Sequence, residues 1–86
     1  MIFAIKHFVS LSKFQDLGYE FSVEDDGVFL WKDTKEHYLN TITFSTRRDS
    51  LKTYTNKGLT MDELDAIALF WIEYNELIEN YERRTN

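Results

Sequence analysis

Residues 59–82, LTMDELDAIALFWIEYNELIENYE, decide the fold, because they combine the local signals that start a helix with a long apolar run. Thr60 and Glu63 have the spacing of a capping box, in which each side chain accepts a hydrogen bond from the backbone N–H of the other residue. Leu59 and Leu64 occupy the flanking positions of a hydrophobic staple. Together these signals predict a helix that begins at Thr60 and continues to the end of the stretch.

The apolar residues of this helix fall on more than one side. A helix at the surface of a small domain is normally apolar along a single stripe. The stripe expected to face the core consists of Leu64, Ile67, Ala68, Trp71, Tyr74, Ile78 and Tyr81. Leu69 and Ile72 fall on the opposite side, among acidic residues that include Glu76. We therefore expect Leu69, Ile72 and Glu76 to belong to a surface that a partner covers.

The beginning of the chain also has helical spacing of apolar residues. This pattern predicts one helix that begins near Phe3 or Ala4 and ends at Leu17, with Gly18 as the C-terminal cap. An alternative remains open, in which Ser10 is the N-cap of a shorter helix and a short strand precedes it.

Between the two helical segments, the pattern changes to that of strands. Alternating apolar and polar residues, with β-branched and aromatic side chains, predict strands over 19–23, 28–32 and 37–46, and a fourth over 51–55. Asp25-Asp26-Gly27 has the composition of a hairpin turn in which glycine supplies a positive φ. The order α-β-β-β-(β)-α predicts a single two-layer α+β domain over residues 1–86, with an antiparallel meander of three to four strands beside the helices.

Composition limits the class of protein. The chain has 86 residues, a net charge of −5 and no cysteine, which excludes disulfides and thiolate metal sites. The apolar N-terminal run is short and is interrupted at Lys6 and His7, so it predicts neither a signal peptide nor a membrane span. We expect a soluble protein of the cytoplasm.

The residue types required for catalysis do not form a recognisable pattern. No nucleophile motif is present, and His7 and His37 are too far apart for a metal-ligand spacing, so we interpret them as a packing residue and a strand-edge residue. The acidic triplet Glu24-Asp25-Asp26 is interpreted as a hairpin tip, because it lacks the ligand spacing of a calcium loop. These observations predict a protein that is not an enzyme and that uses no metal, no cofactor and no small-molecule substrate.

A second interpretation concerns the basic segment 47–57. Residues 37–59 have a net charge of +3, whereas residues 60–86 have a net charge of −5. Cations beside an aromatic ring on a sheet can hold phosphates and stack a base, which makes nucleic-acid binding the alternative function. The residues that would carry it are Arg47, Arg48, Lys52, Tyr54 and Lys57. A third interpretation is that the acidic helix mimics a phosphate backbone.

The whole layout resembles that of small proteins encoded by phages and prophages of Gram-positive bacteria. The resemblance depends on the Leu17-Gly18-Tyr19-Glu20 end of the first helix, the aromatic-rich meander and the Leu59–Leu64 start of the last helix. It implies a non-catalytic accessory protein that binds and modulates or inhibits a host protein, in the host cytoplasm. We expect its partner to be another protein or, as a homodimer, a second copy of the chain.

Overall fold

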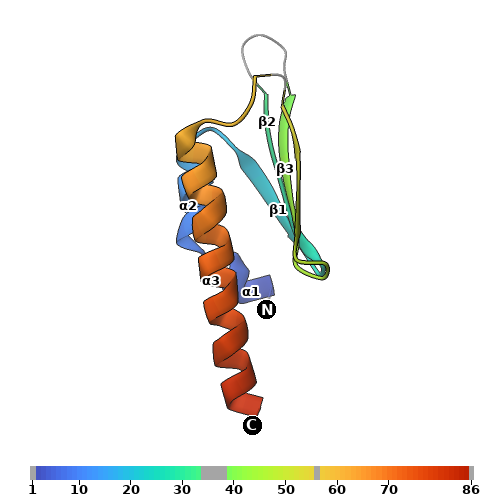
Figure 1. The fold of residues 1–86 in the computed structure, drawn as a ribbon, viewed down its shortest axis with the longest axis vertical. Coiled ribbons are helices and arrows are strands. Elements are labelled where there is room, and N and C mark those ends of the chain that lie inside the picture. Colours follow the sequence, from blue (N-terminus) through green and yellow to red (C-terminus); the bar gives the residue numbers. More distant parts are fainter. Residues whose placement is uncertain (1, 34–38, 56, 86) are drawn as a thin grey trace.

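The computed structural model describes residues 2–33, 39–55 and 57–85 (Figure 1). Within these ranges the chain forms α1 (Ile2–Ile5), α2 (Val9–Asp16), β1 (Glu20–Glu24), β2 (Gly27–Asp33), β3 (Leu39–Ser45), β4 (Ser50–Tyr54) and α3 (Met61–Thr85). The strands make one antiparallel sheet in chain order, and the helices lie on one side of it. The predicted α+β class is confirmed, and the fourth strand is present.

The register of the sheet determines which side chains enter the core. Val28 of β2 is paired with Phe44 of β3, and Leu30 is paired with Ile42, and all four side chains are buried. Phe70 of α3 lies against them, with its ring centroid 3.8 Å from that of Phe44 and an angle of 17° between the rings. Strand residues alternate between the two faces of a sheet, so the residues next to these four point away from the helices.

The predicted single N-terminal helix is wrong, because the chain breaks it into α1 and α2. Phe8 precedes α2 in an extended conformation with φ −62° and ψ 137°. The break allows both Ile5 and Phe8 to enter the core. The alternative with Ser10 as N-cap is also wrong, because Ser10 lies inside α2. The residue at the N-cap position is Phe8, whose side chain makes no capping hydrogen bond.

Two glycines have different roles. Gly18 has φ +97°, and hydrogen bonds from Gly18 N to Gln15 O and from Tyr19 N to Phe14 O form the helix terminus that was predicted. Gly27 is the first residue of β2 rather than a residue of positive φ in the turn. A Cβ atom on Gly27 would lie 1.9 Å from the carbonyl oxygen of Phe44, so the absence of a side chain permits close strand pairing.

The buried side of α3 is centred on Phe70, which the predicted stripe did not include. Glu63, Ala66, Phe70 and Tyr74 are buried, whereas Leu64 and Ala68 are exposed. The difference arises because both α2 and the sheet flank α3. Tyr81, also predicted to face the core, is exposed. The last turns of α3 extend beyond the sheet (Figure 1), and the molecule is correspondingly elongated, with extents of 50 × 19 × 18 Å.

One prediction falls outside the described residues, and another falls within them. His37, interpreted as a strand-edge residue, and residue 38 of the predicted strand over 37–46 are among the positions that the structure does not describe. The acidic triplet lies at the β1–β2 connection, where Glu24 pairs with Gly27 across a two-residue turn, as predicted for a hairpin tip.

Candidate functional site

A line of apolar side chains runs along the outward side of α3. Met61, Leu64, Ala68 and Ile72 are separated by three, four and four positions, a spacing that places them on one side of a helix. All four are exposed, with 71% of Met61, 44% of Leu64 and 54% of Ile72 accessible to solvent. We call these four residues the outer stripe.

The three residues predicted to bind a partner fall on or beside the outer stripe. Ile72 belongs to it, Glu76 is exposed one turn later, and Leu69 is half-buried at its edge. Met61, Leu64 and Ala68 were missed, because Leu64 and Ala68 had been assigned to the core. Their helical spacing with Ile72 was the signal in the sequence that could have identified them.

The outer stripe has acidic neighbours. Between Met61 and Tyr81 the sequence contains no lysine, arginine or histidine. Among the residues of this helix whose burial the structure describes, four carboxylates are exposed to solvent, namely Asp62, Asp65, Glu76 and Glu79. The surface around the outer stripe is therefore apolar along its centre and negatively charged along one side.

The rotation of α3 about its own axis is held at its first turn by a buried pair. The hydroxyl of Tyr19 donates a hydrogen bond to the carboxylate of Glu63, which also accepts the N–H of Thr60 at 2.9 Å. Burial alone would raise the pKa of Glu63, but the hydrogen bonds from Tyr19 and Thr60 outweigh it and hold the pKa below its usual value. Burial, together with the hydrogen bond to Glu63, raises the pKa of Tyr19. The predicted capping box is thus confirmed, and its glutamate has a tertiary partner that sequence reasoning missed.

A second contact holds α3 against α2. Glu73 accepts hydrogen bonds from the backbone N–H groups of Val9 at 2.7 Å and Ser10 at 2.8 Å. Because Glu63 and Glu73 both point into the molecule, the opposite side of α3, with Ile72, must point outward. The exposure of the outer stripe therefore follows from contacts at two separate positions along the helix.

The sheet presents a second surface, on the side away from the helices. The strand register aligns Trp31, Thr41 and Tyr54 in one row, and Phe29, Thr43 and Lys52 in the next. Phe29 and Trp31 are stacked with ring centroids 5.5 Å apart, and the indole N–H of Trp31 donates to Glu20 at 2.8 Å. The sequence analysis did not assign Phe29 and Trp31 to any site.

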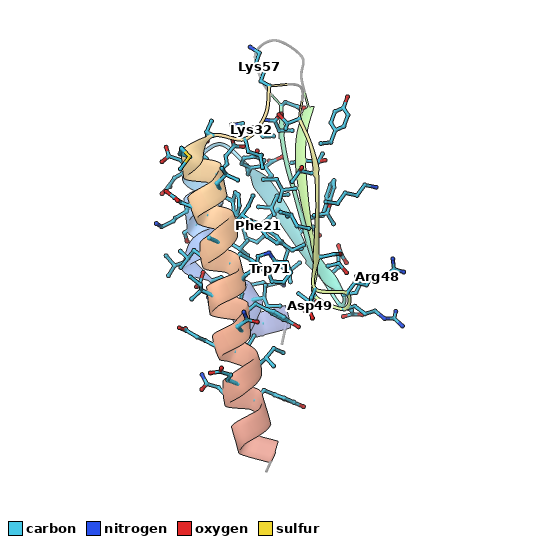
Figure 2. All side chains as sticks on the ribbon, in the orientation of Figure 1. Phe21, Lys32, Arg48, Asp49, Lys57 and Trp71 are labelled. Atoms are coloured by element: carbon cyan, nitrogen blue, oxygen red, sulfur yellow. The ribbon has the colours of Figure 1, made fainter. Side chains whose placement is uncertain are left out.

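The structure separates the residues of the predicted basic surface. Lys52 and Tyr54 lie on the outer face of β4, and Arg47 and Arg48 lie in the turn before it. Figure 2 shows Lys57 and Arg48 at opposite ends of the sheet. Arg47, Arg48 and Lys52 line one polar hollow together with Asp26, Thr43, Ser45 and Ser50. Lys57 does not line this hollow.

Within the described residues, no group of three or more His, Asp or Glu side chains is arranged to hold a metal ion. His7 follows α1 and is exposed, and its ring contacts that of exposed Phe3 edge-on at 4.9 Å, so the prediction that it packs on the apolar face of a helix is wrong. Among the helices described, none is long and apolar enough to cross a membrane.

Comparisons of the chain with protein-family models, with curated proteins and with solved structures found no match. The two surfaces described above are therefore interpreted from their own geometry.

Proposed function

We propose that this protein acts by binding another protein through the outer stripe of α3, without catalysis. The observation that carries the proposal is the exposure of Met61, Leu64, Ala68 and Ile72 along three turns of a helix whose other side already fills the core. An apolar helix face with anchors one turn apart is a common way for a helix to bind a partner.

The shape of the outer stripe suits a partner helix. Ala68 is small and lies between Leu64 and Ile72, so a second helix can approach closely at that point. Complete burial of Leu64 and Ile72 would contribute about 1.5–3 kcal/mol each. This gain must exceed the cost of association and ordering, so additional contacts at the sides of the stripe are required.

The acidic residues along one side of the outer stripe favour a foreign, basic partner over a second copy of the chain. In an antiparallel pair of α3 helices centred on Ala68, Leu64 would face Ile72 of the second copy. Asp62 would then lie near Glu76 of the second copy, and like charges oppose association. A partner helix with lysine or arginine beside its own apolar residues would instead form ion pairs there. We therefore propose a basic amphipathic helix as the binding element of the partner.

The biological role that we propose is modulation or inhibition of a host protein. It follows from the resemblance in layout to phage-encoded accessory proteins, combined with a binding surface on α3. Homodimerisation is the competing explanation for the exposed stripe.

Photocrosslinking tests the proposal. A photoreactive phenylalanine analogue is placed at Leu64, and at exposed Ser12 on α2 as the control, and each protein is irradiated in extract of its native cell. We expect a protein adduct that is specific to position 64. An adduct that is equal at both positions, or absent from both, would contradict the proposal.

The affinity for the crosslinked partner is then measured for Ile72→Asp and for Asn75→Asp, a matched variant that adds the same charge to an exposed position of α3. We expect Ile72→Asp to weaken binding by about 30-fold, as at a buried anchor, and Asn75→Asp to change it little. Added salt should weaken a complex with a basic partner. An adduct with a second copy of the chain, strengthened by salt, would instead establish homodimerisation.

A further inference from the structure

The outer face of the sheet combines two hollows that lie side by side. One is lined by Ser22, Glu24, Phe29 and Trp31 of β1 and β2. The other is lined by Asp26, Thr43, Ser45, Arg47, Arg48, Ser50 and Lys52, most of them from β3, β4 and their turn. Because Phe29 is aligned with Thr43 and then with Lys52, the aromatic hollow and the basic hollow are neighbours across β3.

The aromatic hollow offers the flat face that a planar ring requires. Phe29 is 41% exposed although it is a large apolar residue, and it stacks on Trp31 at an angle of 26°. The Trp31 indole N–H donates a hydrogen bond to one carboxylate oxygen of Glu20, and this contact holds the stacked rings of Phe29 and Trp31 in place. Tyr54, which is 58% exposed, provides a further ring on the other side of Thr41.

The basic hollow is lined by three cations, Arg47, Arg48 and Lys52, and by one carboxylate, that of Asp26. Among the residues that the structure describes, no carboxylate forms an ion pair with Arg47, Arg48 or Lys52. Hydroxyl side chains of Thr43, Ser45 and Ser50 line the same hollow and can donate hydrogen bonds. A group with several anionic oxygens is the ligand that suits this arrangement best.

We infer that the outer face of the sheet binds single-stranded nucleic acid, with bases on Phe29, Trp31 and Tyr54 and phosphates at Arg47, Arg48 and Lys52. Neighbouring strands are separated by about 4.8 Å, so Phe29 of β2 and Lys52 of β4 lie about 10 Å apart across the sheet, a distance that a short run of nucleotides spans. A duplex hides the faces of its bases, so stacking on these rings requires a single strand.

The net charge of −5 does not oppose this inference, because much of it lies elsewhere. Residues 60–86 have a net charge of −5, and α3 lies on the opposite side of the sheet. The exposed acids of β1 and the β1–β2 turn, such as Glu24, limit the path of the bound nucleic acid to β2, β3 and β4. An acidic peptide would also suit the cations, but it would not use the exposed rings of Phe29 and Tyr54.

Fluorescence anisotropy of labelled oligothymidine tests this inference, with the matching duplex and a polyglutamate peptide as competitors. We expect saturable binding of the single strand, with the duplex and the peptide at least about tenfold weaker. Tyr54→Ala and Phe29→Ala should each raise Kd by about tenfold, whereas Tyr54→Trp should retain binding because it keeps a ring face. Thr53→Ala, on the same strand but the inner face, is the matched control.

The salt dependence tests the cations separately. Each lost phosphate contact should reduce the slope of log K against log salt by about 0.7, so Lys52→Gln and the pair Arg47→Gln with Arg48→Gln should flatten it. Lys57→Gln, at the other end of the sheet, and Ile72→Asp, on the outer stripe, should leave binding unchanged. Far-UV circular dichroism verifies that each variant is folded.

Absence of saturable binding, equal affinity for duplex, preference for polyglutamate, or insensitivity to both Tyr54→Ala and Phe29→Ala would each overturn the inference. Because Ile72→Asp serves as a control here, failure of this surface and failure of the outer stripe are distinguishable.

Discussion

The carboxylate of Glu73 in α3 accepts a hydrogen bond from the backbone N–H of Ser10 in α2, at 2.8 Å, although the two residues are 63 positions apart. Its second oxygen accepts the N–H of Val9. The first N–H groups of a helix have no partner within the helix, and Phe8 has no side-chain oxygen to offer them. Glu73 therefore caps α2 from another helix and links the two elements directly.

Removal of this cap should destabilise the fold. We expect Glu73→Ala to lower the free energy of unfolding by about 1–2 kcal/mol, because the N–H groups of Val9 and Ser10 lose their acceptor and α2 loses a negative charge at its N-terminus. Urea denaturation measures the change. Glu76→Ala, which removes an exposed carboxylate from the same helix, is the control. Equal effects of the two variants would show that Glu73 contributes no more than a surface charge.

Ser10 should be replaceable with a gain in stability. Its hydroxyl oxygen is buried and has no hydrogen-bond partner among the described residues. An unsatisfied buried polar group costs about 1–3 kcal/mol, and alanine also has the higher helix propensity. We expect Ser10→Ala to raise the unfolding temperature in a calorimetric scan. Ser12→Ala, at an exposed position of the same helix, is the reference variant. An unfolding temperature that is lower for Ser10→Ala than for Ser12→Ala would contradict the prediction.

The Glu63–Tyr19 pair should make stability depend on pH. The pKa of Glu63 is held below its usual value, so its contribution is present above about pH 4.3 and is lost as the pH falls through the lower folded value. The pKa of Tyr19 is raised, so its contribution is present below about pH 10 and is lost at higher pH.

Denaturation between about pH 3 and pH 7 tests the acid limb. We expect Glu63→Gln to lower the free energy of unfolding at neutral pH and to make it fall less steeply as the pH decreases. Glu76→Gln should leave the fall of the free energy of unfolding in acid unchanged. A decline of the same size in Glu63→Gln would show that other carboxylates cause it.

The orientation of α3 predicts a sharp contrast between two nearby positions. Phe70 is fully buried against Phe44, whereas Ile72 is 54% exposed. We expect Phe70→Ala to cost about 3–5 kcal/mol, and Ile72→Ala to stay within about 0.5 kcal/mol. Chemical denaturation of both variants measures this contrast. A large loss for Ile72→Ala would mean that the outer stripe is covered in the isolated chain, and the proposed binding surface would have to be abandoned.

Local signals were sufficient for much of the fold. The Thr60–Glu63 capping box, the Gly18 terminus and the alternating residues of β1 to β4 depend on neighbours in the chain, so their patterns predicted the elements correctly. The two-layer class followed from the order of these elements. By contrast, the continuous N-terminal helix was wrong, because the break before Val9 is capped by Glu73, which no local pattern can reveal.

The surfaces could be predicted only in part. Helical spacing identified Ile72 as an outward residue, but it assigned Leu64 and Ala68 to the core, since periodicity gives the relative angles of residues and not the direction of the core. Phe29 and Trp31 were recognised only as strand residues. The register with β3 and β4 is what brings them beside Lys52 and Tyr54.

The sequence by itself determined the order of the strands and the start of α3, because capping, glycine conformation and side-chain alternation act over a few residues. Only the tertiary structure decided which side of α3 is buried and which side chains share the outer face of the sheet. Those outcomes depend on contacts such as Tyr19 with Glu63 and Glu73 with Ser10, between residues that are far apart in the chain. Each contact fixes the rotation or position of a whole element, and with it the exposure of every residue that the element carries.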